Sequence, residues 1–140
     1  MASLWQEREK QLLALRERAK RGGGEARMNK QRAAGKLTAR ERLTLLFDPD
    51  TFVEIGELVE SRIDDFGMDE RRVPGDGVVI GYGRVNGRTV CASSEDFTVI
   101  GGTLGEYHSQ KICRIMDMAI DMKCPFVLIN DSGGARIEEG

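Results

Sequence analysis

Apolar residues in the first part of the chain recur at the spacing of a helix. Between residues 3 and 21 they fall three or four positions apart among Glu, Lys and Arg, and Gly22-Gly23-Gly24 follows directly. This pattern predicts an amphipathic helix over 3–21 that ends at the glycines, because glycine favours a helix C-terminus. A second, shorter helix is predicted from Met28 to Ala34. Both helices carry an apolar stripe that needs another surface to cover it.

The next stretch begins a third predicted helix. Thr38 is followed three positions later by Glu41, an arrangement in which each side chain accepts a hydrogen bond from the other residue's backbone N–H. The helix that these residues open carries four apolar side chains, those of Leu43, Leu45, Leu46 and Phe47. Asp48-Pro49-Asp50 then predicts a turn.

A β-hairpin is the clearest feature in the middle of the chain. Residues 78–85 and 88–93 have the composition of strands and flank Asn86-Gly87. Asn-Gly is a preferred pair for a two-residue type I′ turn, so these residues predict an antiparallel hairpin. Before the hairpin, residues 52–59 predict one or two short strands, and residues 62–72 predict a polar loop.

A long helix and a strand follow the hairpin. Thr103 and Glu106 form a second predicted capping box, and residues 103–122 carry apolar residues three and four positions apart. They predict a helix largely buried against a sheet. Residues 126–129 are apolar without alternation, which predicts a strand over 126–130 that is buried on both faces. Hairpin, helix and strand in this order indicate an α/β protein.

Polar residues and glycines begin where that strand is expected to end. Asn130-Asp131-Ser132-Gly133-Gly134-Ala135 follows the apolar run. Ligands of α/β proteins gather at the carboxyl ends of parallel strands, and a glycine turn there can direct successive backbone N–H groups into one concavity. Such a concavity can bind an anion or stabilise an oxyanion. The alternative is a strand-to-helix turn whose glycines serve its geometry alone.

Composition narrows the class of protein. The chain has 140 residues, 40% of them hydrophobic and 31% charged, as expected for one globular domain. It has no apolar run of membrane-spanning length and no signal-peptide pattern, which predicts no direct membrane insertion and a cytoplasmic location. Its three cysteines are odd in number and lack the spacing of metal ligands, which favours reduced thiols.

Charge is divided unevenly along the chain. Residues 1–47 hold 12 Lys or Arg and 5 Asp or Glu, a net +7, whereas residues 48–140 hold 9 and 18, a net −9. A basic arm can bind nucleic acid. It can also pack on a partner or on the acidic remainder of the chain. Because no aromatic platform or DNA-binding motif accompanies the charge, the second interpretation is favoured and no nucleic-acid partner is expected.

Two further features invite a chemical role. His108 is the only histidine and lies near the start of a predicted helix, where it could act as a general base. The carboxylate pairs Asp64-Asp65 and Asp69-Glu70 could bind a metal or act as an acid/base couple. A single histidine at such a position is more often structural, and adjacent acidic residues without a histidine are more often a solvated loop. These simpler interpretations are favoured, and no metal site is expected.

Several motifs taken together resemble the amino-terminal part of biotin-dependent acyl-CoA carboxyltransferase β subunits. This group includes propionyl-CoA carboxylase, methylmalonyl-CoA decarboxylase and transcarboxylase. The resemblance rests on four stretches: residues 35–43 (GKLTARERL), residues 74–83 (PGDGVVIGYG), residues 96–102 (DFTVIGG) and residues 130–137 (NDSGGARI). They occur in the family's order, and their agreement is more specific than any single motif.

The resemblance implies an α/β, crotonase-like fold of β-β-α units, incomplete here and preceded by a helical amino-terminal arm. The expected division is a basic helical arm at 1–47 and the start of an acyl-CoA-binding carboxyltransferase domain at 48–140. The implied activity moves a carboxyl group between carboxybiotin on a partner carrier domain and the α-carbon of a short acyl-CoA. Implied partners are acyl-CoA, a biotin carrier or biotin carboxylase subunit, and further copies of the β subunit. No cofactor is expected on this stretch itself.

The resemblance also implies a role for the glycine turn. The chemistry forms an enolate whose oxygen must be held by backbone N–H donors, and these map to Gly133, Gly134 and Ala135. Ser132 and Arg136 are expected to contact acyl-CoA, with Arg136 either near the CoA phosphates or orienting the turn.

Length is the main departure from the family. Its subunits are several times longer, so a fragment that lacks the second glycine-rich segment and is inactive alone is expected. Two other classes stay open: a crotonase-type hydratase, isomerase or decarboxylase, and a non-enzymatic binding module that uses the basic arm. The motifs leave the particular acyl-CoA, the direction of carboxyl transfer and the oligomeric state undetermined.

Overall fold

The computed structural model describes residues 3–139, so residues 1, 2 and 140 of the predicted arm and domain lie outside the described residues. The helices are α1 (Leu4–Lys20), α2 (Glu25–Ala33), α3 (Ala39–Leu46), α4 (Met68–Arg71) and α5 (Glu106–Met122). The strands are β1 (Val53–Ile55), β2 (Val78–Val85), β3 (Arg88–Glu95) and β4 (Phe126–Ile129).

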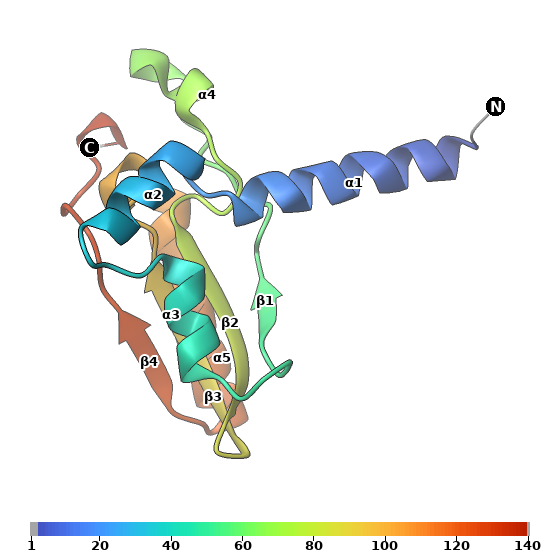
Figure 1. Ribbon diagram of the computed structural model, residues 1–140, viewed down its shortest axis with the longest axis vertical. Coiled ribbons are helices and arrows are strands. Elements are labelled where there is room, and N and C mark those ends of the chain that lie inside the picture. The colour runs from blue at the N-terminus through green and yellow to red at the C-terminus, as the bar shows by residue number, and fades with distance from the viewer. Residues whose placement is uncertain (1–2, 140) are drawn as a thin grey trace.

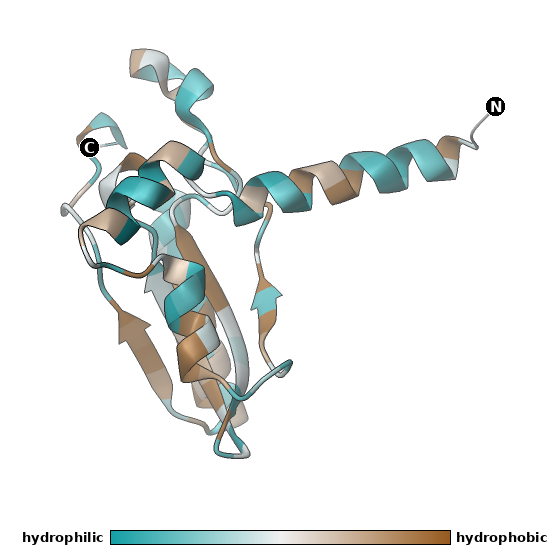
Figure 2. Ribbon diagram, viewed as in Figure 1, coloured by the Kyte–Doolittle hydropathy of each residue, from teal (hydrophilic) through white to brown (hydrophobic). Residues whose placement is uncertain are grey.

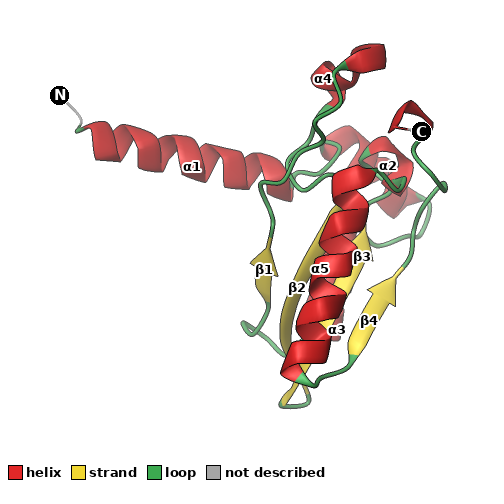
Figure 3. Cartoon of the chain, turned by 180° about the vertical axis from the view of Figure 1, so that it is seen from behind, coloured by secondary structure: helices red, strands yellow, loops and turns green. Residues whose placement is uncertain are grey.

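The four strands form one sheet in the order β1-β2-β3-β4. β1, β2 and β3 are antiparallel, whereas β4 runs parallel to β3 with Ser94 opposite Ile129. The crossover between β3 and β4 contains α5. Figure 1 shows α3 in front of the sheet, and Figure 3, from behind, shows α5 covering the opposite face. The predicted α/β order of hairpin, helix and strand is therefore confirmed.

The predicted hairpin turn is confirmed in detail. Asn86 has φ 50° and Gly87 has φ 78°, and a type I′ turn requires positive φ at both of its central residues. The carboxylate of Asp48 accepts hydrogen bonds from the N–H groups of Asn86 (3.0 Å) and Gly87 (2.8 Å). β3 extends to Glu95, two residues beyond its predicted end.

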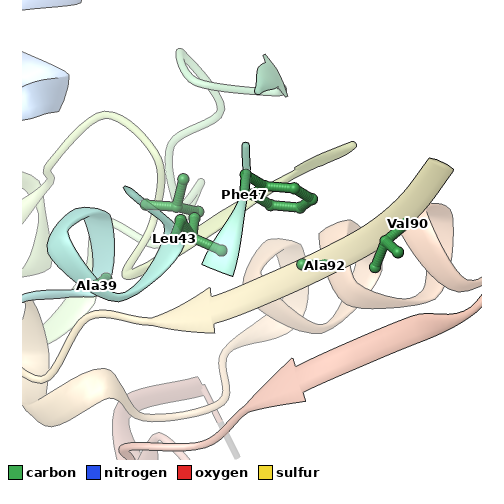
Figure 4. Close-up of a cluster of buried hydrophobic side chains, with 6 residues drawn as sticks. Ala39, Leu43, Phe47, Val90 and Ala92 are labelled. Carbon is green, nitrogen blue, oxygen red and sulfur yellow. The ribbon is translucent and has the colours of Figure 1, made fainter. Parts of the chain in front are cut away.

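The core on one face of the sheet is built from α3. Ala39, Leu43 and Phe47 pack with Val79, Val90 and Ala92 of β2 and β3, and five of these six side chains are labelled in Figure 4. A Cβ atom at Gly83 would lie 2.8 Å from the ring of Phe47, so glycine lets the ring approach the sheet. The capping box of Thr38 and Glu41 is present as predicted. α3 lies inside the predicted basic arm and packs in the core of the sheet, and the predicted division of the chain at residue 47 stays a prediction.

The opposite face is covered by α5. Ile115 and Ala119 are buried against a cluster that contains Ile80 and Cys91. The prediction that this helix is largely buried is wrong, because Met116 is 44% exposed and Ile120 is 73% exposed. A single layer of sheet covers only one side of a helix. The apolar residues of α5 extend beyond that side, so some of them remain exposed.

The start of α5 also differs from the prediction. The helix begins at Glu106, and Thr103 does not cap it: its hydroxyl donates to the carbonyl of Ile100 at 2.6 Å. Carboxylates from distant segments accept hydrogen bonds from the first turn instead. Glu139 accepts from the N–H of Glu106 (2.5 Å) and Asp76 from the N–H of His108 (3.0 Å). Tertiary contacts thus replace the predicted local cap.

Two predictions about exposure are also wrong. The stretch 62–72 was expected to be a polar loop, yet it contains a 3-10 turn and α4, and Met68 is fully buried. β4 was expected to be buried on both faces, yet Leu128 is 44% exposed. Within the described residues β4 pairs only with β3, so it is an edge strand of this sheet.

The first helix projects from the body (Figure 1). Its capping box joins Ser3 and Gln6, and Ala19 is its only buried residue. Figure 2 shows a mostly hydrophilic ribbon with short apolar stretches, and among those apolar side chains Trp5 is 82% exposed and Leu13 is 52% exposed. The prediction that another surface covers this stripe therefore stays a prediction. α2 begins at Glu25, three residues before the predicted Met28.

Candidate functional site

The glycine turn lies where the parallel strands β3 and β4 end (Figure 1). After Ile129 the chain runs alongside residues 101–104 and is held there by three backbone hydrogen bonds. Gly133 N–H donates to Gly101 O (2.9 Å), Leu104 N–H to Gly134 O (2.8 Å) and Arg136 N–H to Leu104 O (2.9 Å). The site is therefore a short extended segment with fixed edges, at the position expected for ligands in α/β sheets.

The three predicted donors differ in how their N–H groups are used. The N–H of Gly133 donates a hydrogen bond to the carbonyl oxygen of Gly101. Gly134 donates to the exposed hydroxyl of Ser132 at 3.1 Å. Ala135 forms a parallel bridge with Leu104 through the groups of its two neighbours, so its own N–H points away from Leu104. The N–H of Ala135 is thus directed away from residues 101–104, whereas that of Gly134 is bonded to an exposed side chain, and the assignment of oxyanion donors stays a prediction.

Glycine is required at the centre of this turn for its conformation. Gly134 has φ 113°, in the range that L side chains rarely adopt, while an added Cβ atom would meet nothing within 4 Å. A substitution here would therefore act through backbone strain and not through a clash within the described residues.

Asp131 ties the start of the turn to the amino-terminal helices. Its carboxylate accepts from Lys36 Nζ (2.9 Å) and Arg42 Nη2 (2.5 Å), and its backbone N–H donates to Glu95 (2.8 Å). Burial raises the pKa of Asp131, but the hydrogen bonds from Arg42 and Lys36 outweigh burial and leave this pKa below its usual value. The sequence analysis assigned no role to Lys36 or Arg42, although both belong to the GKLTARERL stretch.

Arg136 anchors the other end of the turn from inside the protein. It is 2% exposed, and its Nη1 lies 2.7 Å from Asp76 Oδ1 and 2.8 Å from Glu139 Oε1, while Nη2 donates to Thr103 O at 3.1 Å. Burial raises the pKa of Asp76, opposed by the charge of Arg136. These contacts favour the orienting role over contact with CoA phosphates, because the guanidinium is already enclosed by partners.

His108 lies behind the turn and is fully buried. Its Nδ1 is 2.9 Å from the carbonyl oxygen of Asp76, and its Nε2 is 3.6 Å from Glu95 Oε1. Burial lowers the pKa of His108, although Asp76 and Glu95 act in the opposite direction. A ring enclosed in this way supports the structural interpretation over a general base that meets substrate directly.

Lys111 is a buried cation that the sequence analysis missed. It is 4% exposed, and its Nζ donates to the carbonyl oxygens of Gly75 (2.7 Å) and Val78. Burial lowers its pKa to about 8. It lies three residues after His108 on the inner face of α5, so the two side chains together hold the loop that presents Asp76. The sequence signal that could have revealed Lys111 is its place on the side of the predicted helix that faces the sheet.

The predicted acidic pairs take no part in this site. Asp64, whose side chain is 77% exposed, pairs with Arg72. Within residues 3–139, no group of three or more His, Cys, Asp or Glu side chains is placed to hold a metal ion. No helix of the described chain is long and apolar enough to cross a membrane. Cys91, Cys113 and Cys124 are free thiols.

One hollow reaches the glycine turn, and a second hollow adjoins the first. We call the first the turn hollow; it has a volume of about 430 Å³, and its lining includes Gly133, Ala135, Arg27, Phe97 and Thr98. We call the second the cationic hollow; it has a volume of about 360 Å³ and is lined by Arg27, Lys30, Gln31, Ala34, Lys36, Phe97 and Thr98. The two share three lining residues and are therefore adjacent. A surface with three cationic side chains beside an aromatic ring leads directly to the turn.

The sheet, its covering helices and the strand-end glycine turn define an α/β protein of the crotonase-like carboxyltransferase class. The family model described as the carboxyl transferase domain matches residues 30–140, and the chain belongs to this family. The transcarboxylase 12S structure, a hexamer with methylmalonyl-CoA and methylmalonic acid bound, matches 100% of this chain with a TM-score of 0.94 and 48% identity.

Curated relatives agree with this membership. The chain is 58% identical over 118 residues to the methylmalonyl-CoA decarboxylase subunit alpha of Propionigenium modestum, covering 84% of this chain and 23% of that protein. It is 57% identical over 121 residues to the mitochondrial propionyl-CoA carboxylase beta chain of Homo sapiens, covering 85% of this chain and 22% of that protein. The chain thus spans less than a quarter of the length of these relatives.

Proposed function

We propose that this chain supplies the acyl-CoA side of a carboxyltransferase site, in an enzyme that moves a carboxyl group between carboxybiotin and the α-carbon of a short acyl-CoA. Membership of the carboxyl transferase family supports the reaction class. The names of the relatives, which act on propionyl-CoA or methylmalonyl-CoA, support a short acyl chain. The single observation that carries the proposal is the glycine turn at the ends of β3 and β4, with Gly133 and Ala135 at the edge of the turn hollow.

The chemistry explains why such a turn is needed. Carboxylation removes a proton from the α-carbon of the thioester and leaves an enolate, whose α-carbon attacks the carboxyl carbon of carboxybiotin. A carbon–carbon bond forms, the carbon–nitrogen bond to biotin breaks, and the released biotin takes up the proton that the α-carbon lost. Backbone N–H groups of Gly134 and Ala135 stabilise the enolate oxygen, because preorganised donors lower the energy of charge that develops in the transition state.

The cationic hollow fits the other end of the same substrate. Coenzyme A carries phosphate groups and an adenine ring, and phosphates are bound by Arg and Lys while aromatic side chains stack on bases. Lys36 Nζ lies 5.2 Å from the ring centroid of Phe97, so cation and ring occupy one surface. The nucleotide part of acyl-CoA would bind there, and its acyl arm would reach the turn through the adjoining turn hollow.

The remaining components belong to the enzyme as a whole. The transcarboxylase 12S structure is a hexamer, and on this basis we propose that the protein assembles with further copies of itself. A biotin carrier would supply carboxybiotin, and the second glycine-rich segment, in the rest of the subunit, would supply a further oxyanion donor. The same proposal includes a cytoplasmic location, no nucleic-acid partner and no cofactor on this segment.

A glycine substitution tests the proposal in the full-length subunit assembled with its biotin partner. Gly134→Val should lower kcat for carboxyl transfer about 100- to 1,000-fold, the usual effect of losing one oxyanion donor. Gly87→Val is the matched control, because Gly87 also has positive φ (78°) and open space around its Cβ position but lies at the opposite end of the sheet (Figure 1). Near-normal transfer by a folded Gly134→Val enzyme would remove the turn from the mechanism. An equal loss in both variants would point to general destabilisation.

A further inference from the structure

The first residue of the glycine turn is held by a buried carboxylate at the end of the neighbouring strand. Glu95 is the last residue of β3 and is 3% exposed. Its Oε2 accepts the backbone N–H of Asp131 at 2.8 Å. Because Ser94 lies opposite Ile129 in the parallel pair, Glu95 lies alongside the residue that leaves β4. This contact continues the pairing of β3 and β4 after the backbone ladder has ended.

The second oxygen of Glu95 faces His108. His108 Nδ1 lies 2.9 Å from the carbonyl oxygen of Asp76, and since a carbonyl only accepts, Nδ1 carries the ring proton. In the neutral ring Nε2 is then an acceptor. It lies 3.6 Å from Glu95 Oε1 and has no hydrogen-bond partner within residues 3–139. Two buried acceptors thus face each other, and a donor at either position would complete the pair.

The same histidine connects to the anchor of the other end of the turn. The backbone N–H of His108 donates to Asp76 Oδ2 at 3.0 Å, and Asp76 Oδ1 lies 2.7 Å from Arg136 Nη1. Glu95, His108, Asp76 and Arg136 therefore form a continuous buried chain of contacts beneath residues 131–136. The same cluster of polar side chains therefore contacts both ends of the turn.

We propose that Glu95 is a positioning residue for the oxyanion turn, which it fixes through the N–H of Asp131. The role rests on the proposed function of the turn, but the anchoring itself does not. Glu95 lies next to Asp131 and acts on Gly134 and Ala135 only through the backbone between them. A misplacement of about 1 Å in such a site costs about 100-fold in rate.

Substitutions of Glu95 in the full-length assembled subunit separate anchoring from charge. Glu95→Leu removes the acceptor for Asp131 and should lower kcat about 100-fold while leaving KM for acyl-CoA within about threefold, because the cationic hollow lies elsewhere. Glu95→Gln is the conservative control. Its amide oxygen can accept from Asp131 and its amide NH₂ can donate to His108 Nε2, so kcat should stay close to that of the unaltered enzyme.

Amide hydrogen exchange measures the anchoring of the turn independently of the carboxyl-transfer reaction. In Glu95→Leu the amides of residues 130–136 should exchange about five- to tenfold faster, as expected for the loss of a hydrogen bond that contributes about 1 to 1.4 kcal/mol. In Glu95→Gln they should exchange as in the unaltered protein. If Glu95→Leu fails to assemble, Glu95→Asp, which withdraws the carboxylate by one methylene, should give the same faster exchange and loss of kcat.

Two results would overturn the positioning role. One is unchanged exchange and kcat in Glu95→Leu. The other is a Glu95→Gln enzyme as impaired as Glu95→Leu, which would assign the effect to charge. A subunit in which exchange responds as expected but Gly134→Val does not slow carboxyl transfer would instead refute the proposed function and leave the anchoring intact.

Discussion

The two turns that close this sheet at opposite ends are held in different ways. The hairpin turn at Asn86-Gly87 depends on its own φ values and on one carboxylate, that of Asp48. The glycine turn at 131–136 depends on charged side chains contributed by separate segments of the chain, of which Glu95 and Asp76 are buried. The hairpin turn is therefore a local structure, whereas the glycine turn is preorganised by the tertiary fold. Preorganised polar groups are what a site that stabilises developing charge requires.

The largest expected difference between the turns comes from their carboxylate anchors. Asp76→Ala should destabilise the region around the glycine turn by about 3 kcal/mol, because it removes a partner of the buried Arg136 guanidinium and leaves that charge with Glu139 alone. The measurement is the free energy of local opening of residues 126–136, from amide exchange in the full-length subunit. A loss below about 1 kcal/mol would mean that Glu139 alone satisfies Arg136 and that the buried pair is not an essential anchor.

Lys111 offers a pH-dependent form of the same test. Burial lowers its pKa to about 8, and the unfolded value is about 10.4. Between these values the opened state binds more protons than the folded state, so local stability should rise as pH increases from about 8 to 10, by up to roughly 3 kcal/mol. Lys111→Met should lack this rise. Amide exchange of residues 74–80 across this pH range measures the effect, and a parallel rise in both proteins would assign it to another group.

The smallest expected effect is at the hairpin. Asp48→Ala removes the acceptor for the N–H groups of Asn86 and Gly87. Both are near solvent and can bond to water, so the cost should be about 1 kcal/mol. Exchange of the amides of residues 78–95 measures this cost, and residues 126–136 should be unaffected. A cost equal to that of Asp76→Ala would end the distinction between a local turn and a tertiary one.

Sequence patterns predicted the elements whose causes are local. The capping box of Thr38 and Glu41, the hairpin at 78–93 and the strand predicted over 126–130 all depend on residues a few positions apart, and each is present, although the strand ends at Ile129. The predicted capping box at Thr103 failed because carboxylates 30 or more residues away in sequence, those of Asp76 and Glu139, accept from the first turn of α5. Local pattern could not anticipate a competitor from so far along the chain.

The candidate site likewise has one part that the sequence could predict and another that it could not. The glycine turn itself could be located from a strand-end run of polar residues and glycines. Its anchors could not, because Lys36, Arg42 and Glu95 converge on Asp131 only after the sheet and helices have formed. His108 could be singled out as the only histidine, but its enclosure between Asp76 and Glu95 depends on which face of α5 meets the sheet.

By itself, the sequence determined where most of the helices, strands and turns form and which family the motifs resemble, since the spacing of apolar residues, capping residues and turn dipeptides act over short distances. Only the tertiary structure decided which charges are buried, what they contact and in which direction the N–H groups of the glycine turn point. The physical reason is that a charge can be buried only where partners from other segments compensate its lost hydration. Those partners are neighbours in space and not in sequence.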